Sequence, residues 1–279
     1  MRFLAIGHVT RDEFAGEDGW RLGGPPTYTT ATAARLGAQA TLVTRVGPNE
    51  RPVLEERCAA LGIALHALPA ETTTTFAFRY EDGRRILKLR ARARALALSD
   101  VPSAVRGADA VILGSVAHEI DRSLLGAFGA AATVVTAQGY LREWAADGTI
   151  RPRRWDDVAE VAAKTSAIVL SEDDVAGDLD EPRRWVGHAP IIVTLADRGS
   201  LVMTGDGEKL VPAFRADRVV DATGAGDAFA AGLAIALAER RPLLEAVRFA
   251  HGVASFAVEG VGTDGLADRK RVEERIARG

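Results

Sequence analysis

The sequence predicts an α/β fold, with a doubly wound, mostly parallel sheet and helices on both of its faces. Short, continuously apolar runs recur along the chain, and segments with helical periodicity separate them. Strands that are apolar throughout suit a sheet buried on both faces, and their alternation with helices is typical of parallel βαβ units. Because no internal repeat, low-complexity segment or linker is found, residues 1–279 are expected to form one domain.

The expected elements can be taken in order from the N-terminus. A buried strand at residues 3–6 stops at Gly7, and further apolar strands are expected at 41–46, 110–113, 133–136, 167–170 and 191–195. Helical patterns are expected from Tyr28 to about Leu36, and at 53–61, 123–131, 155–163, 243–258 (interrupted at Gly252) and 269–277. Another helix follows Gly226, where apolar residues recur at intervals of four.

The segment from residue 72 to 89 has a different pattern. Threonine and aromatic residues alternate up to Tyr80, Glu81-Asp82-Gly83 supplies a turn, and apolar residues follow. This pattern predicts a β-hairpin. On sequence alone an ordinary edge hairpin and a hairpin that covers a ligand are both open.

Composition excludes several classes of protein. The chain is 47% hydrophobic and 26% charged, with a formal charge of −3, so neither nucleic acid nor an anionic membrane is expected as a partner. The single cysteine, Cys58, excludes an intrachain disulfide framework and suits a reducing compartment. No signal peptide and no apolar run of roughly 20 residues is found, so a cytoplasmic protein is expected.

The chain from Asp221 to Gly232 carries the most chemical information. Gly224 and Gly226 allow backbone amides to approach a ligand, and these amides lie at a helix N-terminus, which favours an anion such as phosphate. Asp227 falls in the first turn, where a carboxylate would take a proton from an attacking hydroxyl. Alternatively, the segment is a strand-to-helix turn in which Asp227 only complements the helix dipole. Neither a P-loop nor a dinucleotide-binding fingerprint occurs, and a nucleotide-cofactor dehydrogenase is therefore disfavoured.

This segment closely resembles the C-terminal signature of the ribokinase (PfkB) family of carbohydrate kinases, D-T-x-G-A-G-D. The resemblance implies a ribokinase-like fold with a small β-lid and a phosphoryl transfer from ATP with Mg²⁺. It implies that Asp227 is the catalytic base and that the amides of Gly224, Ala225 and Gly226 form an anion hole. The hydroxyl of Thr223 would orient the phosphate.

The resemblance also implies residues for the acceptor. Asp12, shortly after the first strand, would bind sugar hydroxyls, and Gly23 with Gly24 matches the family's N-terminal Gly-Gly signature. Tyr28 departs from the family, because many members have a sugar-binding Asn there. The loop from Gln138 to Arg142 resembles the Gln-Gly-x-x-Arg loop of the inositol-kinase-like branch. In that reading Gln138 bridges polyol hydroxyls and Arg142 pairs with a carboxylate or orients the loop; the alternative for Arg142 is a surface position.

Three further expectations follow from the resemblance. The β-lid would consist of about residues 12–23 and 72–92, and it would exclude water from the site. Thr194 and Gly199, in a segment similar to the family's T-x-G-x-x-G, would contact ATP, with Ala196 in place of the first glycine. Asp174, in Ser171-x-x-Asp174 where the family has N-x-x-E, would reach Mg²⁺ through water, or else serve only in a helix N-cap.

The function expected from the sequence is an ATP-dependent kinase for a hydroxyl of a small sugar or polyol. The Gln138 loop and Tyr28 favour myo-inositol or a similar cyclitol. A ribose, fructose or nucleoside kinase of the same family is the alternative, and a non-catalytic polyol-binding protein on the kinase fold is another. The resemblance also allows a monovalent cation and a homodimer.

Overall fold

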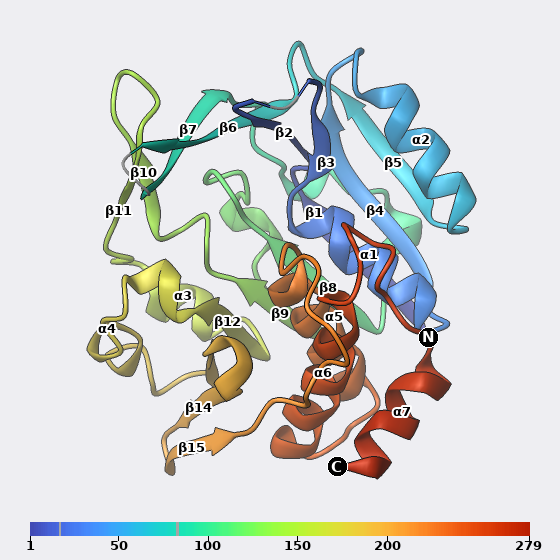
Figure 1. The fold of residues 1–279 in the computed structure, drawn as a ribbon, viewed down its shortest axis with the longest axis vertical. Coiled ribbons are helices and arrows are strands. Elements are labelled where there is room, and N and C mark those ends of the chain that lie inside the picture. Colours follow the sequence, from blue (N-terminus) through green and yellow to red (C-terminus); the bar gives the residue numbers. More distant parts are fainter. Residues whose placement is uncertain (17, 82–83) are drawn as a thin grey trace.

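The computed structural model describes residues 1–16, 18–81 and 84–279, and the side chains of 80–85 are excluded from the description. The largest element over these ranges is a nine-stranded sheet with the order β15-β14-β13-β12-β9-β8-β1-β4-β5 (Figure 1). The strands from β13 to β5 run parallel, and β14 pairs antiparallel with both β13 and β15. The bounds of these strands are β1 Arg2–Gly7, β4 Gln39–Val46, β5 Ala64–Pro69, β8 Ala110–Gly114, β9 Ala132–Thr136, β12 Ala167–Ser171, β13 Ile191–Thr194, β14 Ser200–Thr204 and β15 Gly207–Val211.

Helices cover both faces of this sheet, as the sequence predicts. Because side chains alternate along a strand, Phe3 and Ala5 of β1 join the apolar cluster on one face, and Leu4 and Ile6 join the cluster on the other. The first cluster contains the long helices, and the second contains the shorter ones. The bounds are α1 Pro25–Arg35, α2 Arg51–Ala60, α5 Ala225–Ala238, α6 Leu243–Ala257 and α7 Arg269–Arg278, then α3 Val158–Ala162 and α4 Asp180–Arg183. Short 3-10 turns lie at Leu98–Asp100, Ser103–Val105, Arg122–Leu124, Glu172–Val175 and Ala196–Arg198.

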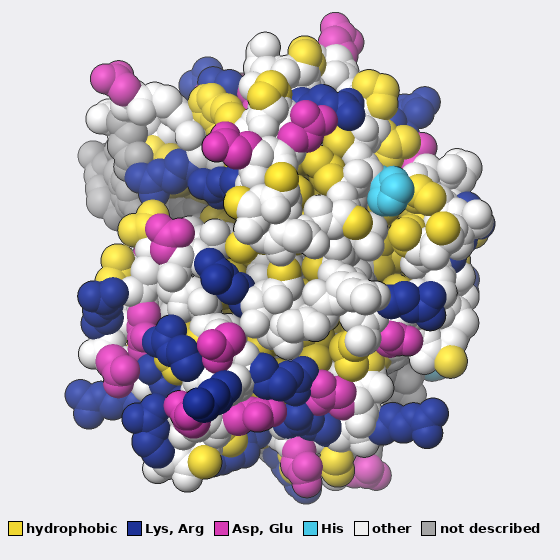
Figure 2. All heavy atoms as spheres, turned by 90° about the vertical axis from the view of Figure 1, so that its right-hand side faces the viewer, with side chains coloured by type: hydrophobic (Ala, Val, Ile, Leu, Met, Phe, Trp, Pro, Cys, Tyr) yellow, Lys and Arg dark blue, Asp and Glu magenta, His cyan; other side chains and the backbone are white. Residues whose placement is uncertain are grey.

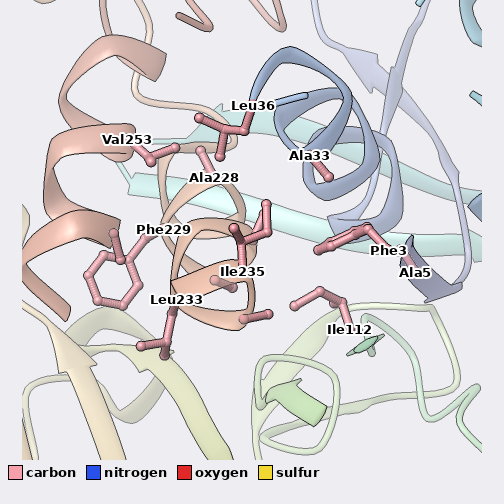
Figure 3. Close-up of a cluster of buried hydrophobic side chains, with 14 of the residues drawn as sticks. Phe3, Ala5, Ala33, Leu36, Ile112, Ala228, Phe229, Leu233, Ile235 and Val253 are labelled. Carbon is pink, nitrogen blue, oxygen red and sulfur yellow. The ribbon is translucent and has the colours of Figure 1, made fainter. Parts of the chain in front are cut away.

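Helix α5 lies in the middle of the first cluster. Figure 3 shows Phe229, Leu233 and Ile235 of α5 among side chains from α1, α6 and the strands beneath. Nine consecutive residues of this helix, 228–236, are buried. A helix buried on all sides is fixed by packing, so its first turn is held in place by the core.

A second sheet lies beside the first. It has the strand order β3-β2-β6-β7, with β2 at Thr10–Phe14, β3 at Arg21–Gly23, β6 at Thr74–Glu81 and β7 at Arg84–Ala91. We call it the small sheet; Figure 1 shows it at the top of the molecule, above the ends of β1 and β4. The antiparallel pairing of β6 with β7 confirms the predicted hairpin, while Asp82 and Gly83 of the predicted turn lie outside the described residues.

Three helix predictions need correction. The helix expected at 123–131 is wrong: the structure has a 3-10 turn at Arg122–Leu124 and then turns, because Gly126 and Gly129 adopt left-handed φ angles of 75° and 58°. The helix expected at 155–163 is shorter, and only Val158–Ala162 is helical. The interruption predicted at Gly252 is also wrong, because α6 passes through it unbroken. A Cβ there would lie 2.7 Å from Ile276, so the glycine lets α7 pack closely on α6.

The C-terminal helix is anchored by a buried arginine. Arg275 of α7 forms ion pairs with Glu259 at 2.8 Å and Asp217 at 3.0 Å, and its guanidinium stacks on Phe256. Around it the surface of α7 mixes both signs of charge, as the lower part of Figure 2 shows. A short hairpin of β10 (Arg142–Trp144) and β11 (Ile150–Pro152), which the sequence did not predict, lies beside β7.

Within the described ranges, no helix has the length and apolar character that crossing a membrane requires.

Candidate active site

The residues singled out in the sequence follow strands whose carboxyl ends share one edge of the large sheet. Gln138 follows β9, Asp174 follows β12, and Thr194 ends β13. Asp12 lies on β2 of the small sheet, and only two residues separate the end of β1 from the start of β2. Ligand sites in doubly wound sheets occupy this edge, so the fold brings the candidate residues to the expected place.

The first turn of α5 has the geometry of an anion site. Gly224 is the N-cap residue, with φ 81° and ψ −1°, and no described side chain caps the helix. Before the turn, the carboxylate of Asp221 accepts a hydrogen bond from the amide of Thr223 at 2.9 Å. The amide of Ala225 donates to the Ala222 carbonyl at 3.2 Å, whereas that of Gly226 has no partner within the helix. The turn therefore presents amides and the positive end of the α5 dipole to this edge of the sheet.

Asp227, in the same turn, has a strongly perturbed carboxyl group. Its side chain is partly exposed, yet protein atoms crowd it, and the loss of hydration raises its pKa to about 7. The carboxylate of Asp174 raises this pKa further, and the guanidinium of Arg142 opposes the rise. A carboxyl group with a pKa near 7 can both accept and release a proton at neutral pH, as a general base must.

Tyr28 joins the acceptor-side residues to this turn. A Cβ on Gly224 would lie 2.4 Å from Cδ1 of Tyr28, so the ring is packed directly against the glycine. Burial raises the pKa of the Tyr28 phenol, and the carboxylates of Asp227, Asp12 and Asp221 raise it further. The phenol consequently remains neutral, and able to donate a hydrogen bond, at neutral pH.

The Gly23-Gly24 pair is required by close approach of the backbone. A Cβ on Gly23 would lie 2.1 Å from the carboxylate of Asp12, which also accepts a hydrogen bond from the Thr10 hydroxyl at 2.8 Å. Gly24 caps α1 with a left-handed φ of 85°, and a Cβ there would lie 2.4 Å from the carbonyl of His8. The glycines therefore bring β2, β3 and the start of α1 together around Asp12.

Gln138 was expected at the acceptor and Asp174 near Mg²⁺, and the structure shows the two side chains in contact. The amide of Gln138 donates to Asp174 Oδ1 at 3.2 Å, and the other carboxylate oxygen accepts from the amide and hydroxyl of Ser171, both at 2.9 Å. Ser171 and Asp174 thus form the capping arrangement that the sequence left open as the alternative for this motif.

Arg142 begins β10, directly after the Gln138 loop. Its guanidinium lies 6.0 Å from the ring centroid of Phe76 on the small sheet and lowers the pKa of Asp227. Its carbonyl accepts from Nε2 of His118 at 2.6 Å. Arg142 is therefore placed between the small sheet and the candidate base, not at an outer surface.

The expected donor-side residues have structural roles as well. The hydroxyl of Thr194 donates to the Leu170 carbonyl at 3.3 Å. Gly199 has φ 103°, and a Cβ there would lie 2.0 Å from the Val211 carbonyl. Ala196, at the position of the family's first glycine, takes a left-handed φ of 54°, so the backbone shape survives the replacement. Arg198 pairs with Glu172 and joins this loop to the one after β12.

A buried network at the base of the small sheet escaped the sequence analysis. The carboxylate of Glu119, fully buried, accepts from the amides of His8, Val116 and Ala117 and from the Ser115 hydroxyl. The ring of His8 contacts the Thr74 hydroxyl through Nδ1 at 2.8 Å and the Arg94 carbonyl through Nε2 at 3.0 Å. Because a carbonyl only accepts, Nε2 carries the proton, and burial lowers the pKa of His8. No sequence signal links His8 with Glu119, since contacts of this kind depend on the tertiary fold.

The donor set at this edge does not form a cage for a metal ion. Among the described residues, no group of three or more His, Cys, Asp or Glu side chains could hold one. Asp174 is the acidic residue that the sequence analysis linked to Mg²⁺, and both of its carboxylate oxygens already accept hydrogen bonds within the protein. This arrangement fits a Mg²⁺ that is bound chiefly by donor phosphates and water.

Comparisons with known proteins cover nearly the whole chain. The pfkB family carbohydrate kinase model matches residues 19–269. A cytidine kinase from Thermococcus kodakarensis is 27% identical over 267 residues, which cover 89% of this chain and 92% of that protein. The ribokinase of Bacillus subtilis is 39% identical over 90 residues only, so that alignment spans 32% of this chain and 30% of the relative's length.

Solved structures share the fold at low sequence identity. A pyrophosphate-dependent kinase in the ribokinase family, complexed with a pyrophosphate analogue and myo-inositol, superimposes with a TM-score of 0.79 at 19% identity, over 98% of this chain and 99% of that one. The nucleoside kinase of Methanocaldococcus jannaschii gives a TM-score of 0.73 at 18% identity, over 100% and 99% of the two chains.

Proposed function

Because this chain belongs to the pfkB family of carbohydrate kinases, a family of phosphotransferases with an alcohol acceptor, we propose that it phosphorylates a small sugar or polyol with ATP. Within that class we favour myo-inositol or a similar cyclitol. The observation that carries the proposal is Asp227, a carboxyl group with a pKa of about 7 in the uncapped first turn of α5. A structural turn would not need an ionisable group held at this pKa beside an anion site.

The proposed reaction divides the work among residues of this chain. Asp227 accepts the proton of the acceptor hydroxyl as its oxygen attacks the terminal phosphoryl group. The amides of the Gly224–Gly226 turn stabilise the charge that builds on that group, with the Ala225 amide exchanging its bond to Ala222 for the phosphate. Mg²⁺ bound to the donor phosphates would supply charge neutralisation. That Thr194, Gly199 and Thr223 contact ATP stays a prediction. A bound monovalent cation and a homodimer also stay predictions.

For the acceptor we propose Asp12, Tyr28, Gln138 and Arg142, with the small sheet as a lid. Asp12 accepts from vicinal hydroxyls, and the neutral phenol of Tyr28 donates to them. Gly23 and Gly24 allow the acceptor to approach the backbone at the start of α1. Gln138, which donates to Asp174, would also form a hydrogen bond with a polyol hydroxyl. Arg142 at the start of β10 would contact the acceptor next to Phe76.

A nucleoside is the second candidate acceptor, and one observation favours it. Phe14 and Phe78 stack at 4.8 Å between ring centroids, with an interplanar angle of 12°. Phe14 and Phe78 lie two residues after Asp12 and Phe76 on their strands, so they share the face of the small sheet that carries Asp12. An aromatic base could stack on such a surface, and a cytidine kinase aligns over most of the chain.

The test is turnover with Mg²⁺-ATP, and separately with pyrophosphate, against myo-inositol, ribose, fructose, adenosine and cytidine. We expect ADP release that depends on one acceptor and is lost in Asp227→Asn. Preference for cytidine or adenosine would select the nucleoside candidate. Saturable polyol binding without turnover on either donor would contradict the proposal and identify a non-catalytic binder.

A further inference from the structure

The β10–β11 hairpin, residues 142–152, connects parts of the molecule that the sequence keeps apart. Its first strand begins at Arg142, at the end of the proposed acceptor loop, and its tip reaches β7 of the small sheet. Figure 1 shows the hairpin at the upper left, beside the end of β7. We call this hairpin the strap.

The tip of the strap is built to pair with β7. The amide of Leu89 donates to the carbonyl of Gly148 at 2.9 Å, and Lys88 pairs with Thr149 as an antiparallel bridge. Gly148 has a left-handed φ of 81°, and a Cβ there would lie 2.3 Å from the Leu89 carbonyl. Only glycine allows the two backbones to approach this closely.

An acidic residue holds the shape of the tip. Asp147 accepts from the amide and hydroxyl of Thr149 at 3.0 and 2.8 Å, and from the ammonium group of Lys88 at 2.7 Å. Lys88 first, and then Thr149, hold the pKa of Asp147 below its ordinary value. The same carboxylate thus folds the turn and joins it to the small sheet.

The body of the strap packs against the loop after β8. The rings of Trp144 and His118 lie 5.0 Å apart, and Arg92 lies 5.7 Å from the Trp144 ring. Arg92 also donates to the carbonyls of Ala117 and His118 at 2.6 and 2.8 Å. Trp144 and Ile150 pack on a buried cluster of Phe76, Leu89, Val116 and Ala117. This packing joins the small sheet, the strap and the loop after β8.

The junction between strap and β7 is nevertheless narrow. A cavity of about 580 Å³, lined by residues 88–92 and 144–148, lies beside these contacts. The backbone contacts that join the strap to β7 are therefore those at the tip, and a single substitution there weakens them while the packing of Trp144 and Ile150 remains.

We propose that the strap fastens the small sheet to the acceptor loop, so that both remain one body throughout turnover. Gly148 is the positioning residue of this junction. A small sheet without the backbone contacts at the tip would be free to shift relative to Gln138 and Arg142, whereas a strapped one moves together with them. The part of this inference that concerns turnover rests on the proposed function; the fastening itself does not.

The first test measures the fastening without substrate. Amide hydrogen exchange of β7 is compared in Gly148→Ala and Gly129→Ala; Gly129 also has a left-handed φ, of 58°, but no atom lies within 4 Å of an added Cβ. We expect the amides of β7 to exchange at least roughly tenfold faster than in the wild type in Gly148→Ala, and at the wild-type rate in Gly129→Ala. Asp147→Ala should show the same effect more weakly. Unchanged exchange in both junction variants would overturn the proposal, whether or not the chain is a kinase.

The second test locks the junction. Lys88 and Thr149 form a non-hydrogen-bonded antiparallel pair, because the Leu89 amide bonds the Gly148 carbonyl, and such pairs have the Cα separation that a disulfide needs. The native Cys58 is buried in α2 and should not interfere. In the Lys88→Cys/Thr149→Cys variant we expect oxidised and reduced protein to turn over within about twofold of each other. Loss of turnover on oxidation, regained on reduction, would show that β7 must leave the strap. If wild-type protein turns over no acceptor, the proposed function fails while the exchange experiment still decides the fastening.

Discussion

The aromatic ring of Tyr28 supports Gly224, at a distance that leaves no room for a Cβ on the glycine. Tyr28 belongs to the proposed acceptor side and Gly224 to the proposed phosphate side, so the contact joins the two. The two glycines of the turn differ in this respect, because a Cβ on Gly226 would meet no protein atom within 4 Å.

We therefore predict opposite effects on folding for the two glycines. Gly224→Ala forces an L residue into φ 81° against the Tyr28 ring and should lower both thermal stability and turnover. Gly226→Ala lies in the first turn of a helix and should leave the free energy of unfolding unchanged or raise it by about 0.5–1 kcal/mol, while turnover falls because the methyl group occupies phosphate space. Melting curves and kcat decide this. A fully active Gly226→Ala would contradict the assigned anion hole.

The pKa of Asp227 predicts the pH dependence of catalysis. A base works in its ionised form, so kcat/KM for the acceptor should rise with pH and reach half of its plateau near pH 7. Asp227→Asn should lower turnover by at least about a thousandfold, with donor affinity nearly unchanged. Initial rates from pH 5 to 9 and donor titration of the variant provide the check. Near wild-type turnover in the variant would remove Asp227 from the mechanism.

The same pKa predicts a gain in stability when the base is removed. The pKa of Asp227 is higher in the folded protein than its ordinary value of 3.8, so its contribution to stability is present at low pH and is lost as pH rises toward about 7. Asn does not titrate. The free energy of unfolding of Asp227→Asn should therefore exceed that of the wild type by roughly 1–4 kcal/mol at pH 8, allowing for partial exposure, and by less at pH 5. Urea titrations at both pH values measure the difference; a variant less stable at pH 8 would contradict the assigned pKa.

Asp174 and Arg142 should shift the catalytic pH midpoint in opposite directions. Asp174→Asn removes a negative charge that raises the pKa of Asp227, so the midpoint should move down by about 0.5–1 unit. Arg142→Met removes a positive charge that lowers it, so the midpoint should move up. Asp173→Asn, an exposed neighbour of Asp174, serves as the control and should shift nothing. Shifts in the same direction for both variants would show that another group sets the midpoint.

The fold could largely be predicted because its strands are buried on both faces. Runs such as those around Leu4 and Ile168 are apolar throughout, and they alternate with helical patterns. The strap could not be predicted, since its strands have three residues each and owe their form to β7, a remote segment. The helix expected at 123–131 failed because two glycines there adopt left-handed angles that an apolar pattern does not reveal.

The candidate site was predictable where a local motif carries it. The turn from Asp221 to Asp227 needs only its own residues to present amides at a helix N-terminus, so the motif was readable. Contacts between distant segments were not, and three of them reshape the site: Tyr28 with Gly224, Gln138 with Asp174, and His8 with Glu119. Each pairs residues whose types are common and whose spacing in the chain means nothing by itself.

The layout has a consequence for how such a catalyst can acquire new acceptors. Its proposed acceptor groups lie on the small sheet, the start of α1, the loop after β9 and the strap, whereas the phosphate turn begins a helix packed into the core. Substitutions among the acceptor groups can therefore change the specificity for the acceptor while the phosphate turn keeps its structure. Tyr28 is the exception, because any replacement of its ring also removes the support of Gly224. A change of acceptor through a substitution at position 28 would therefore require a second substitution that restores the packing against Gly224.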